Sequence, residues 1–469
     1  MRESRLLGVR LSCYVRPMRD EQEKLLEVAS RVVRMARLGA EVAEASAGSS
    51  WDLSARVRLG QPELVEEAGQ RGVSLRVLRE GRLAMTSTSD LSESGLERLV
   101  KDALELADLC ESDPLMGPAP SELIGHPPYP DLDLFDDSVA SIDAKEALDR
   151  ATRAEKAALD SDPRITLSEG ATFSRTSSVR ALVLSGGFEA VTRGSYASLS
   201  VVPVVEDEGG KKRRGYYWTA KRHLMDLEDE TFVGQEATRR TLAKLGARKV
   251  PTGTLPIVFD ADSARSILGT FAGPLLGSSL WRKSSYLLDR IGTKVASPLV
   301  TIIDDPLVVR GPGSRNFDGE GLDSRRTFVV KDGILESYLL DCYSARKLGL
   351  EPTASASRAG GSIGPSTTNF ILAAGQVSPE EVIARTERGL LVTEMMGFGF
   401  NAITGDFSRG AAGFLIEDGR LSHPVSEVTI SSNLDRMLQG IDLVANDLEL
   451  KSSTASPTFR VDAMTVSGS

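Results

Sequence analysis

The sequence is poor in histidine and cysteine. Its 469 residues include three histidines, His126, His223 and His423, and three cysteines. The histidines lie far apart, and no HExxH, HExxxH or CxxC motif occurs. Catalytic zinc sites usually combine nitrogen ligands at short spacing with a positioned carboxylate. The sequence therefore predicts no zinc site of its own, and an odd number of cysteines argues against a disulfide framework.

Long apolar runs and an excess of positive charge are also missing. No stretch approaches the roughly 18 apolar residues of a membrane span. The 56 basic and 66 acidic residues give a net charge of −10, which disfavours binding to nucleic acid or to anionic membranes. The N-terminus does not have the pattern of a secretory signal. We therefore expect a cytoplasmic protein with neither a membrane nor a nucleic acid as direct partner.

What is present is an ordinary globular composition, long enough for about three domains. The patterning predicts an α+β protein, in which N-terminal helix and antiparallel-sheet domains precede a strand-rich, barrel-like C-terminal domain. Met18 is a better helix start than Met1, so the first residues are interpreted as an extension. The expected segments are the extension at 1–19, a first α/β domain at 20–111, a proline-rich linker at 112–137, a middle antiparallel α+β domain at 138–248 and the C-terminal domain at 249–469.

Hydrophobic periodicity predicts the elements within these segments. Apolar residues at helical spacing indicate helices at 20–38, after Ser92, at about 141–160 and at about 228–246. Alternation predicts a strand at 51–60 and a hairpin that joins 73–79 to 82–86 through Glu80 and Gly81. Short apolar runs predict strands at 164–167, 179–184, 197–205, 215–221, 255–259, 299–303, 326–330, 413–417 and 425–431, with helices at 261–276 and 379–388.

A five-residue stretch at 360–364, GGSIG, matches the G-x-S-x-G elbow of serine hydrolases. Ser362 is followed along the chain by Asp406 or Asp418 and then His423, which is the order of that triad. The elbow needs a strand before the serine and a helix after it, and neither flank has that pattern. A stand-alone serine hydrolase that uses Ser362 remains an alternative, although a flexible glycine loop is the simpler interpretation.

Two charged clusters have simpler interpretations than ligand binding. The basic run 211–214 lies next to aromatic residues, but the acidic run 206–208 precedes it, which is typical of a hairpin tip with facing opposite charges. A carboxylate-rich patch could bind Ca²⁺ or Mg²⁺, but it lacks EF-hand spacing, and turn formation explains it as well. The patch consists of Asp304, Asp305, Asp318, Glu320 and Asp323. Cys342 is interpreted as a buried or half-buried thiol and not as a nucleophile.

Longer stretches in both halves resemble the TldD/PmbA family, also called modulator of DNA gyrase. In the C-terminal half they are NFDGEG at 316–321, DGILESYL at 332–339, YSARKLG at 343–349, NAITGDFSRGAAGFLIEDG at 401–419, PV at 424–425, EVTI at 427–430, NL at 433–434 and AMTVSG at 463–468. In the N-terminal half they are RGVSLRV at 71–77, TSTSD at 86–90, EGATFS at 169–174 and SGGFE at 185–189. The resemblance spans about residues 20–469.

The resemblance implies a role in intracellular proteolysis. The family has two branches that pair as a heterodimer: one carries a zinc motif of the type HExxxH, and the PmbA (TldE) branch lacks it. The corresponding helix is ARSILGTFAGPLLG at 264–277, and no histidine or acidic residue occurs from 263 to 288. No metal ligand can therefore be assigned to this chain, and the resemblance places it in the zinc-free branch, with Zn²⁺ expected in the partner.

We therefore expect the zinc-free subunit of a heterodimeric metalloprotease. It would pair with a zinc-bearing TldD-type paralogue, shape the cavity for an unstructured peptide and have no catalytic residue of its own. The alternative is a non-proteolytic binding or scaffold protein on the same fold. The candidate cavity or interface residues are Asp318, Glu320, Asn401, Gly405, Asp406, Ser408 and Arg409.

Overall fold

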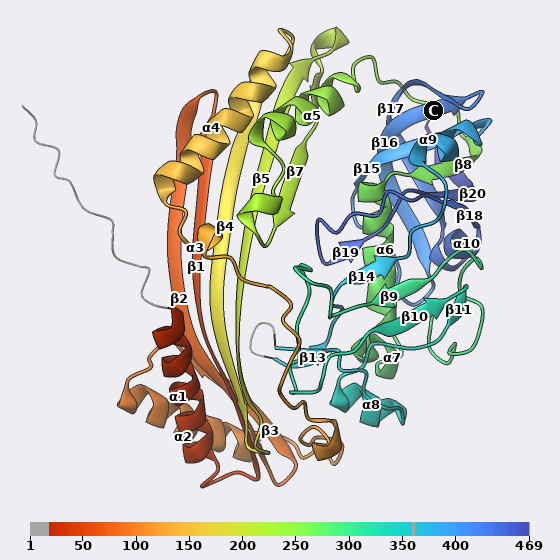
Figure 1. Cartoon of the computed structure of the whole chain (residues 1–469). Helices are drawn as coiled ribbons and strands as arrows, with labels where there is room; N and C mark the ends of the chain where they lie inside the picture. Colours follow the sequence, from red (N-terminus) through yellow and green to blue (C-terminus); the bar gives the residue numbers. More distant parts are fainter. Residues whose placement is uncertain (1–17, 359–361, 469) are drawn as a thin grey trace, which may run out of the picture.

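The computed structural model describes residues 18–358 and 362–468, and its N-terminal half is built on one long antiparallel sheet (Figure 1). The strand order is β3-β2-β1-β4-β5-β6, and β7 also pairs with β5. The bounds are β1 (Val42–Arg58), β2 (Gln61–Arg79), β3 (Arg82–Thr88), β4 (Leu167–Leu184), β5 (Glu189–Glu206), β6 (Lys212–Arg214) and β7 (Tyr217–Lys221). Because β1 pairs with β4, the ranges 20–111 and 138–248 contribute to the same sheet.

Helices cover one face of this sheet at both ends (Figure 1). At one end lie α1 (Met18–Ala36) and α2 (Glu93–Leu109); at the other lie α4 (Ala144–Ser161), preceded by the short α3 (Asp137–Ala140), and α5 (Glu230–Leu242). Alternate residues of β1 face these helices, with Ala45 in the first core and Leu53 in the second. The opposite face of β4 packs through Leu182 against the C-terminal half, near Phe317.

Several local predictions for the N-terminal half are confirmed. The hairpin joins β2 to β3 through Glu80 and Gly81, both at positive φ. Ser92 caps α2 by accepting a hydrogen bond from the backbone N–H of Gly95. The predicted strand at 51–60 covers only the second part of β1. The first part of β2, 61–71, was not predicted, because it is exposed on both faces and has no apolar alternation.

A closed five-stranded barrel lies in the C-terminal half. Its order is β17-β16-β15-β8-β20, and pairing of β17 with β20 closes it. The bounds are β8 (Gly253–Phe259), β15 (Arg388–Met396), β16 (Asp406–Glu417), β17 (Arg420–Asn433) and β20 (Phe459–Ser467), with β18 (Ile441–Val444) added beside β20. The predicted α+β class with a barrel-like C-terminal part is therefore confirmed.

A second sheet in this half has the order β11-β10-β9-β14-β19. Its strands are β9 (Ile302–Asp304), β10 (Thr327–Lys331), β11 (Ile334–Leu335), β14 (Phe370–Leu372) and β19 (Thr454–Ala455), and β12 (Ala356–Ser357) pairs separately with β13 (Gly364–Pro365). The helices are α6 (Ala261–Leu275), α7 (Gly277–Trp281), α8 (Cys342–Leu348), α9 (Pro379–Ala384) and α10 (Leu434–Gln439). Helix α6 packs against β8 and β15 of the barrel and against β14 and β19 of this sheet (Figure 1).

The two halves are joined by several polar contacts. The segment 112–137 runs over the C-terminal half, where the hydroxyl of Tyr343 donates to Asp113 at 2.8 Å. The guanidinium of Arg222, after β7, donates to the backbone oxygens of Gly311 and Pro312 at 2.8 and 2.7 Å. None of the helices in the described ranges has both the length and the apolar character of a membrane span.

Candidate functional site: a pocket beside helix α6

Helix α6 has two faces of different character. Its apolar residues Ala264, Ile267, Leu268 and Phe271 follow the i, i+3, i+4, i+7 pattern and are buried in the C-terminal core. Asp260 caps the helix by accepting from the backbone N–H of Ser263 at 2.8 Å. Burial of this carboxyl group raises its pKa to about 7. The core packing and the cap together fix which residues the helix turns away from the core.

The other face of α6 lines a pocket of about 530 Å³. The helix contributes Arg265, Ser266, Gly269 and Thr270. The remaining lining residues are Phe398 from the β15–β16 connection, Arg409 from β16, and Ser452, Ser453 and Thr454 from the segment that enters β19. Three stretches that are distant in the sequence thus meet here, and none of the lining residues is acidic.

Two arginines dominate the charge of this pocket. Arg409 donates from Nη1 to the hydroxyl of Ser266 at 2.9 Å, and Arg265 donates from Nη1 to the hydroxyl of Ser452 at 3.3 Å. The Nε atoms of both arginines are buried without a hydrogen-bond partner. Burial lowers the pKa of Arg409, since removal from water disfavours the charged guanidinium. The site is therefore a partly desolvated, positively charged cavity with unused donors.

The pocket lies near the junction with the N-terminal sheet. The guanidinium carbon of Arg265 is 5.5 Å from the ring centroid of Trp218 on β7. The hydroxyl of Tyr196 on β5 donates to the backbone oxygen of Lys451, next to Ser452, at 2.9 Å. Both halves of the chain therefore position the groups around α6.

Of the predicted candidate residues, only Arg409 lines this pocket. Ser408 pairs through its backbone with Gly399, at 2.8 Å from N to O. Asn401, Gly405 and Asp406 form a closed turn: the side chain of Asn401 accepts from the N–H of Ile403, Gly405 has a φ of +79°, and Asp406 accepts from the hydroxyl of Thr404. These residues thus form a turn at the start of β16, the strand from which Arg409 lines the pocket.

Asp318 and Glu320 are buried elsewhere and do not line the pocket. Asp318 accepts from the backbone N–H groups of Glu320, Leu322 and Ala356 at 2.8 to 3.0 Å. Glu320 accepts from the backbone N–H of Cys342 at 2.8 Å. Burial, together with the negative charge of Asp318, raises the pKa of Glu320 to about 7. The observed role of both side chains is to satisfy backbone donors of neighbouring loops.

Two further members of the carboxylate-rich patch, Asp304 and Asp305, also have partners within the protein. Asp304 accepts from the backbone N–H and the hydroxyl of Thr368, at 2.7 and 2.8 Å, and Asp305 forms an ion pair with Arg326 at 2.6 Å. Within the described residues, no three side chains of His, Cys, Asp or Glu converge in a way that could hold a metal ion. Cys342 is buried as predicted, and burial together with Glu320 raises the pKa of its thiol.

The remaining sequence motifs are also accounted for. Residues 360 and 361 of the G-x-S-x-G match lie outside the described residues, and Ser362 is followed by strand β13 and not by the helix of an elbow. The basic run 211–214 forms the predicted hairpin, in which Arg213 forms an ion pair with Asp207 at 2.7 Å. His423 has its Nδ1 3.2 Å from the hydroxyl of Ser422. None of these groups lines the pocket at α6.

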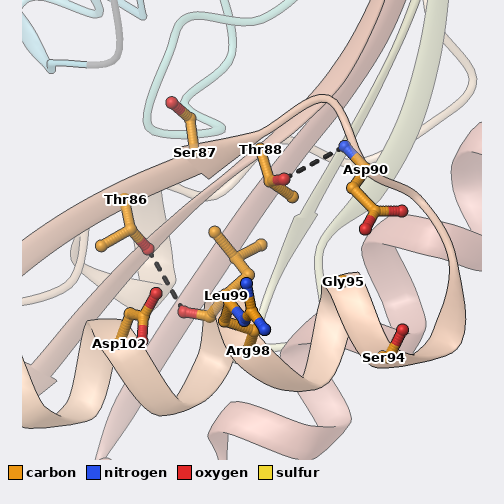
Figure 2. A pocket seen from close by; sticks show the side chains of 9 residues that line it. All are labelled: Thr86, Ser87, Thr88, Asp90, Ser94, Gly95, Arg98, Leu99 and Asp102. Atoms are coloured by element: carbon orange, nitrogen blue, oxygen red, sulfur yellow. Dashed lines mark hydrogen bonds between the residues drawn. The ribbon is translucent and has the colours of Figure 1, made fainter.

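A second pocket, of about 440 Å³, lies between β3 and α2 (Figure 2). Figure 2 shows Thr86 and Thr88 on one side and Arg98 and Asp102 on the helix. Two of its threonines have local partners: Thr86 donates to the backbone oxygen of Leu99, and Thr88 accepts from the N–H of Asp90. Charges of both signs line it, so it has no clear preference for a ligand charge.

The sequence interpretation missed most of the α6 site. It treated this helix only as one that lacks metal ligands. Arg265, Ser266, Gly269 and Thr270 occupy i, i+1, i+4 and i+5, which is one helical face opposite the apolar stripe. That signal was available in the sequence. The approach of Phe398, Arg409 and Ser452 to this face depends on tertiary packing of α6 between the barrel and the second sheet.

Comparison with known proteins gives a consistent match along the chain. The PmbA/TldA metallopeptidase domain 1 matches residues 43–107, the central domain matches 137–245, and the C-terminal domain matches 252–468. The metalloprotease PmbA of Escherichia coli O157:H7 is 37% identical over 450 residues, which cover 96% of this chain and 97% of that protein. A crystal structure from Bacteroides thetaiotaomicron, of a proposed modulator of DNA gyrase, superimposes with a TM-score of 0.89 at 30% identity, covering 96% of this chain and 99% of that one.

Relatives of both branches occur in one organism. In Haemophilus influenzae, a metalloprotease PmbA homologue is 33% identical over 96% of this chain and 98% of its own length. A TldD homologue from the same organism is 29% identical over 70% of this chain and 72% of its own length. This chain is thus similar to both relatives. The match to the PmbA homologue covers a larger share of this chain, and at a higher sequence identity, than the match to the TldD homologue.

Proposed function

The chain belongs to the PmbA/TldD metallopeptidase family, and on that premise we propose that it is the zinc-free subunit of a heterodimeric metalloprotease. Its partner would be a zinc-bearing TldD-type paralogue that supplies the metal and the catalytic groups. This chain would help to form the cavity in which unstructured peptides are cleaved, and we propose the cytoplasm as its compartment.

The observation that supports this proposal most strongly is the polar face of α6. An HExxxH motif places its three functional residues at i, i+1 and i+5 of a helix. The face of α6 that lines the pocket presents Arg265, Ser266, Gly269 and Thr270, and none of them is a histidine or a carboxylate. A guanidinium is a cation with no acceptor and does not bind a metal ion. The residues therefore do not fit zinc, although the helix still presents this face to a cavity.

The distribution of relatives supports the choice of partner. A PmbA homologue and a TldD homologue both occur in Haemophilus influenzae, as a two-subunit enzyme made of paralogues requires. Within its described residues, the chain has no converging metal ligands. Pairing with a zinc-bearing paralogue explains how such a chain could be a subunit of a metallopeptidase.

The proposal is tested by measuring cleavage of an unstructured peptide by the purified chain alone, by the HExxxH paralogue from the same genome alone, and by their mixture. We expect the mixture to be active and a zinc chelator to abolish that activity. The control replaces the glutamate of the HExxxH motif in the paralogue by glutamine, which should inactivate the mixture without preventing co-purification.

Other outcomes would contradict the proposal in distinct ways. Chelator-sensitive cleavage by this chain alone would mean that it holds a metal site. Chelator-resistant cleavage that is lost in Ser362→Ala would favour the serine hydrolase. If the paralogue does not co-purify with the chain and the mixture is inactive, the non-proteolytic scaffold becomes the better interpretation.

A further inference from the structure

We propose that the α6 pocket is a binding site for a carboxylate, presented by a peptide at its C-terminus or on an acidic side chain. The site would capture the anion through Arg265 and Arg409. Only the identification of the ligand as a peptide depends on the proposed function; binding of a carboxylate by this chain would be a property of the isolated chain.

The first step is the balance of charge in the pocket. Arg409 forms no ion pair with any described residue, and the contact of Arg265 with Asp262 is long, at 3.7 Å. Asp262 also lies 3.3 Å from Arg240, which shares its negative charge. Two guanidinium groups thus face a cavity without an acidic lining residue. An anion is the ligand that would compensate this charge.

The second step is the supply of hydrogen-bond donors. A guanidinium carries five N–H donors, and Arg409 and Arg265 each donate one hydrogen bond to a serine hydroxyl. Their Nε atoms also have no hydrogen-bond partner, so both guanidinium groups have N–H donors that the protein does not use. The planar fork of a guanidinium fits both oxygens of a carboxylate. The hydroxyl of Ser266, which accepts from Arg409, keeps its own hydrogen available for donation.

The third step is the shape of the pocket. Gly269 forms part of the lining, and a Cβ at this position would meet no atom within 4 Å. A volume of about 530 Å³ is within the range of small-ligand pockets and is large enough for a terminal residue and not only for its carboxylate. Phe398 is 98% exposed beside the arginines and offers an apolar surface to the rest of the ligand. A carboxylate attached to an apolar or extended chain therefore suits the site.

The test measures binding of short fluorescent peptides to the chain alone, without partner, metal or cleavage. Three peptides of otherwise identical sequence are compared: one with a free C-terminal carboxylate and no acidic side chain, its C-terminal amide, and the amide with one glutamate. We expect the free acid to bind at least about 10-fold more tightly than the amide, as the loss of a charge-assisted hydrogen bond implies. Tight binding of the glutamate peptide would support side-chain carboxylates as ligands.

Variants locate the site. Arg409→Met keeps the aliphatic stem and should weaken binding of the free acid on the order of 10- to 100-fold, and Arg409→Lys should restore part of it. Gly269→Leu should block the pocket while both arginines remain. Arg420→Met removes the same charge at an exposed strand end and should leave the affinity unchanged. Thermal unfolding of each variant shows whether the fold is retained.

Three results would overturn the assignment. They are equal affinity of the amide and of both carboxylate-bearing peptides, equal losses in Arg409→Met and Arg420→Met, and displacement by inorganic phosphate with no displacement by acetate. Because the assay needs no protease activity, a negative result would leave the heterodimer proposal standing. An inactive heterodimer would equally leave this binding site standing.

Discussion

Asp318 and Glu320 are two residues apart and both buried, yet their carboxyl groups have different surroundings. Asp318 accepts three backbone hydrogen bonds, which favour an ionised carboxylate and partly offset the burial that raises its pKa. Glu320 accepts one backbone hydrogen bond and lies close to the charge of Asp318. The pKa of Glu320 is therefore raised to about 7, above its ordinary value of 4.5.

This raised pKa predicts that Glu320→Gln stabilises the protein in weakly basic solution. A raised folded-state pKa contributes stability below about pH 4.5, and that contribution is lost as the pH rises to about 7. The neutral glutamine avoids this loss and still accepts from the N–H of Cys342. We expect the variant to be more stable than the wild type by about 1–3 kcal/mol at pH 8, with a smaller difference at pH 5.

Thermal unfolding of both proteins at pH 5 and pH 8 measures this effect. Glu387→Gln, at an exposed position, is the control and should follow the wild type. Parallel pH profiles of the wild type and Glu320→Gln would show that Glu320 does not titrate in this range.

At the scale of elements, a side chain of helix α4 binds the turn of the β1–β2 hairpin. Leu59 and Gly60 join β1 to β2 at φ values of 50° and 73°. Their N–H groups donate to the two carboxylate oxygens of Glu155 on α4, each at 2.9 Å. Glu155 is buried, so this carboxylate links the helix layer to the end of the sheet.

We expect Glu155→Gln to destabilise the protein by about 1–3 kcal/mol, because the amide NH₂ cannot accept one of the two hydrogen bonds and leaves a buried donor unsatisfied. Hydrogen exchange at Gly60 should accelerate together with the loss of stability. Asp149→Asn on the same helix, in an exposed pair with Lys145, is the control and should change stability by less than about 0.5 kcal/mol. Equal effects of the two substitutions would contradict this assignment.

Two glycines of β16 should respond differently to substitution. A Cβ at Gly413 would lie 1.8 Å from the backbone oxygen of Leu391 on β15, whereas a Cβ at Gly410 would meet its nearest atom, in Met396, at 3.4 Å. The irregular registers of β15 with β16 and of β16 with β17 bring the chains close at Gly413. We therefore expect Gly413→Ala to destabilise the barrel by at least about 1–3 kcal/mol, as overpacking does, and Gly410→Ala to be tolerated. Urea unfolding of the two variants measures the difference.

At the scale of the whole molecule, a buried ion network joins the two halves. Glu44 on β1 contacts Arg76 on β2 at 2.8 Å and also pairs with Arg358, which follows β12. Burial by itself would raise the pKa of Glu44, but the two guanidinium groups outweigh it and lower the pKa below 4.5. The carboxylate of Glu44 thus links the N-terminal sheet to the C-terminal half, and both Arg76 and Arg358 compensate its charge.

Removal of this charge should be costly. We expect Glu44→Gln to destabilise the protein by about 3–5 kcal/mol at pH 7, because two buried guanidinium groups lose their counter-ion. A lowered folded-state pKa contributes stability above pH 4.5 that is lost as the pH falls through the folded value. The difference in stability between Glu44→Gln and the wild type should therefore narrow in acid. The difference for Glu320→Gln narrows in acid as well, but there the variant is the more stable protein. A gap that does not change with pH would contradict this role.

Much of the architecture could be predicted from local patterns. The hairpin at Glu80 and Gly81, the cap at Ser92 and the apolar stripe of α6 depend on turn geometry, capping and periodicity, which short segments encode. The exposed part of β2 could not be found in this way, since a strand with no buried face has no alternation. Of the candidate site residues, Arg409 lines a pocket. The carboxylates of Asp318 and Glu320 instead accept backbone hydrogen bonds and stabilise neighbouring loops.

The sequence by itself determined the family, through the resemblance of long stretches in both halves. It also determined the α+β class and the lack of a metal-binding motif, because these follow from residue types, spacing and periodicity along the chain. Only the tertiary structure decided that β1 joins both N-terminal segments in one sheet and that Arg265 and Arg409 face the same cavity. The physical reason is that pairing of distant strands and closure of the barrel bring together residues that are far apart in the sequence. The distance between two such residues in space cannot be deduced from their separation along the chain.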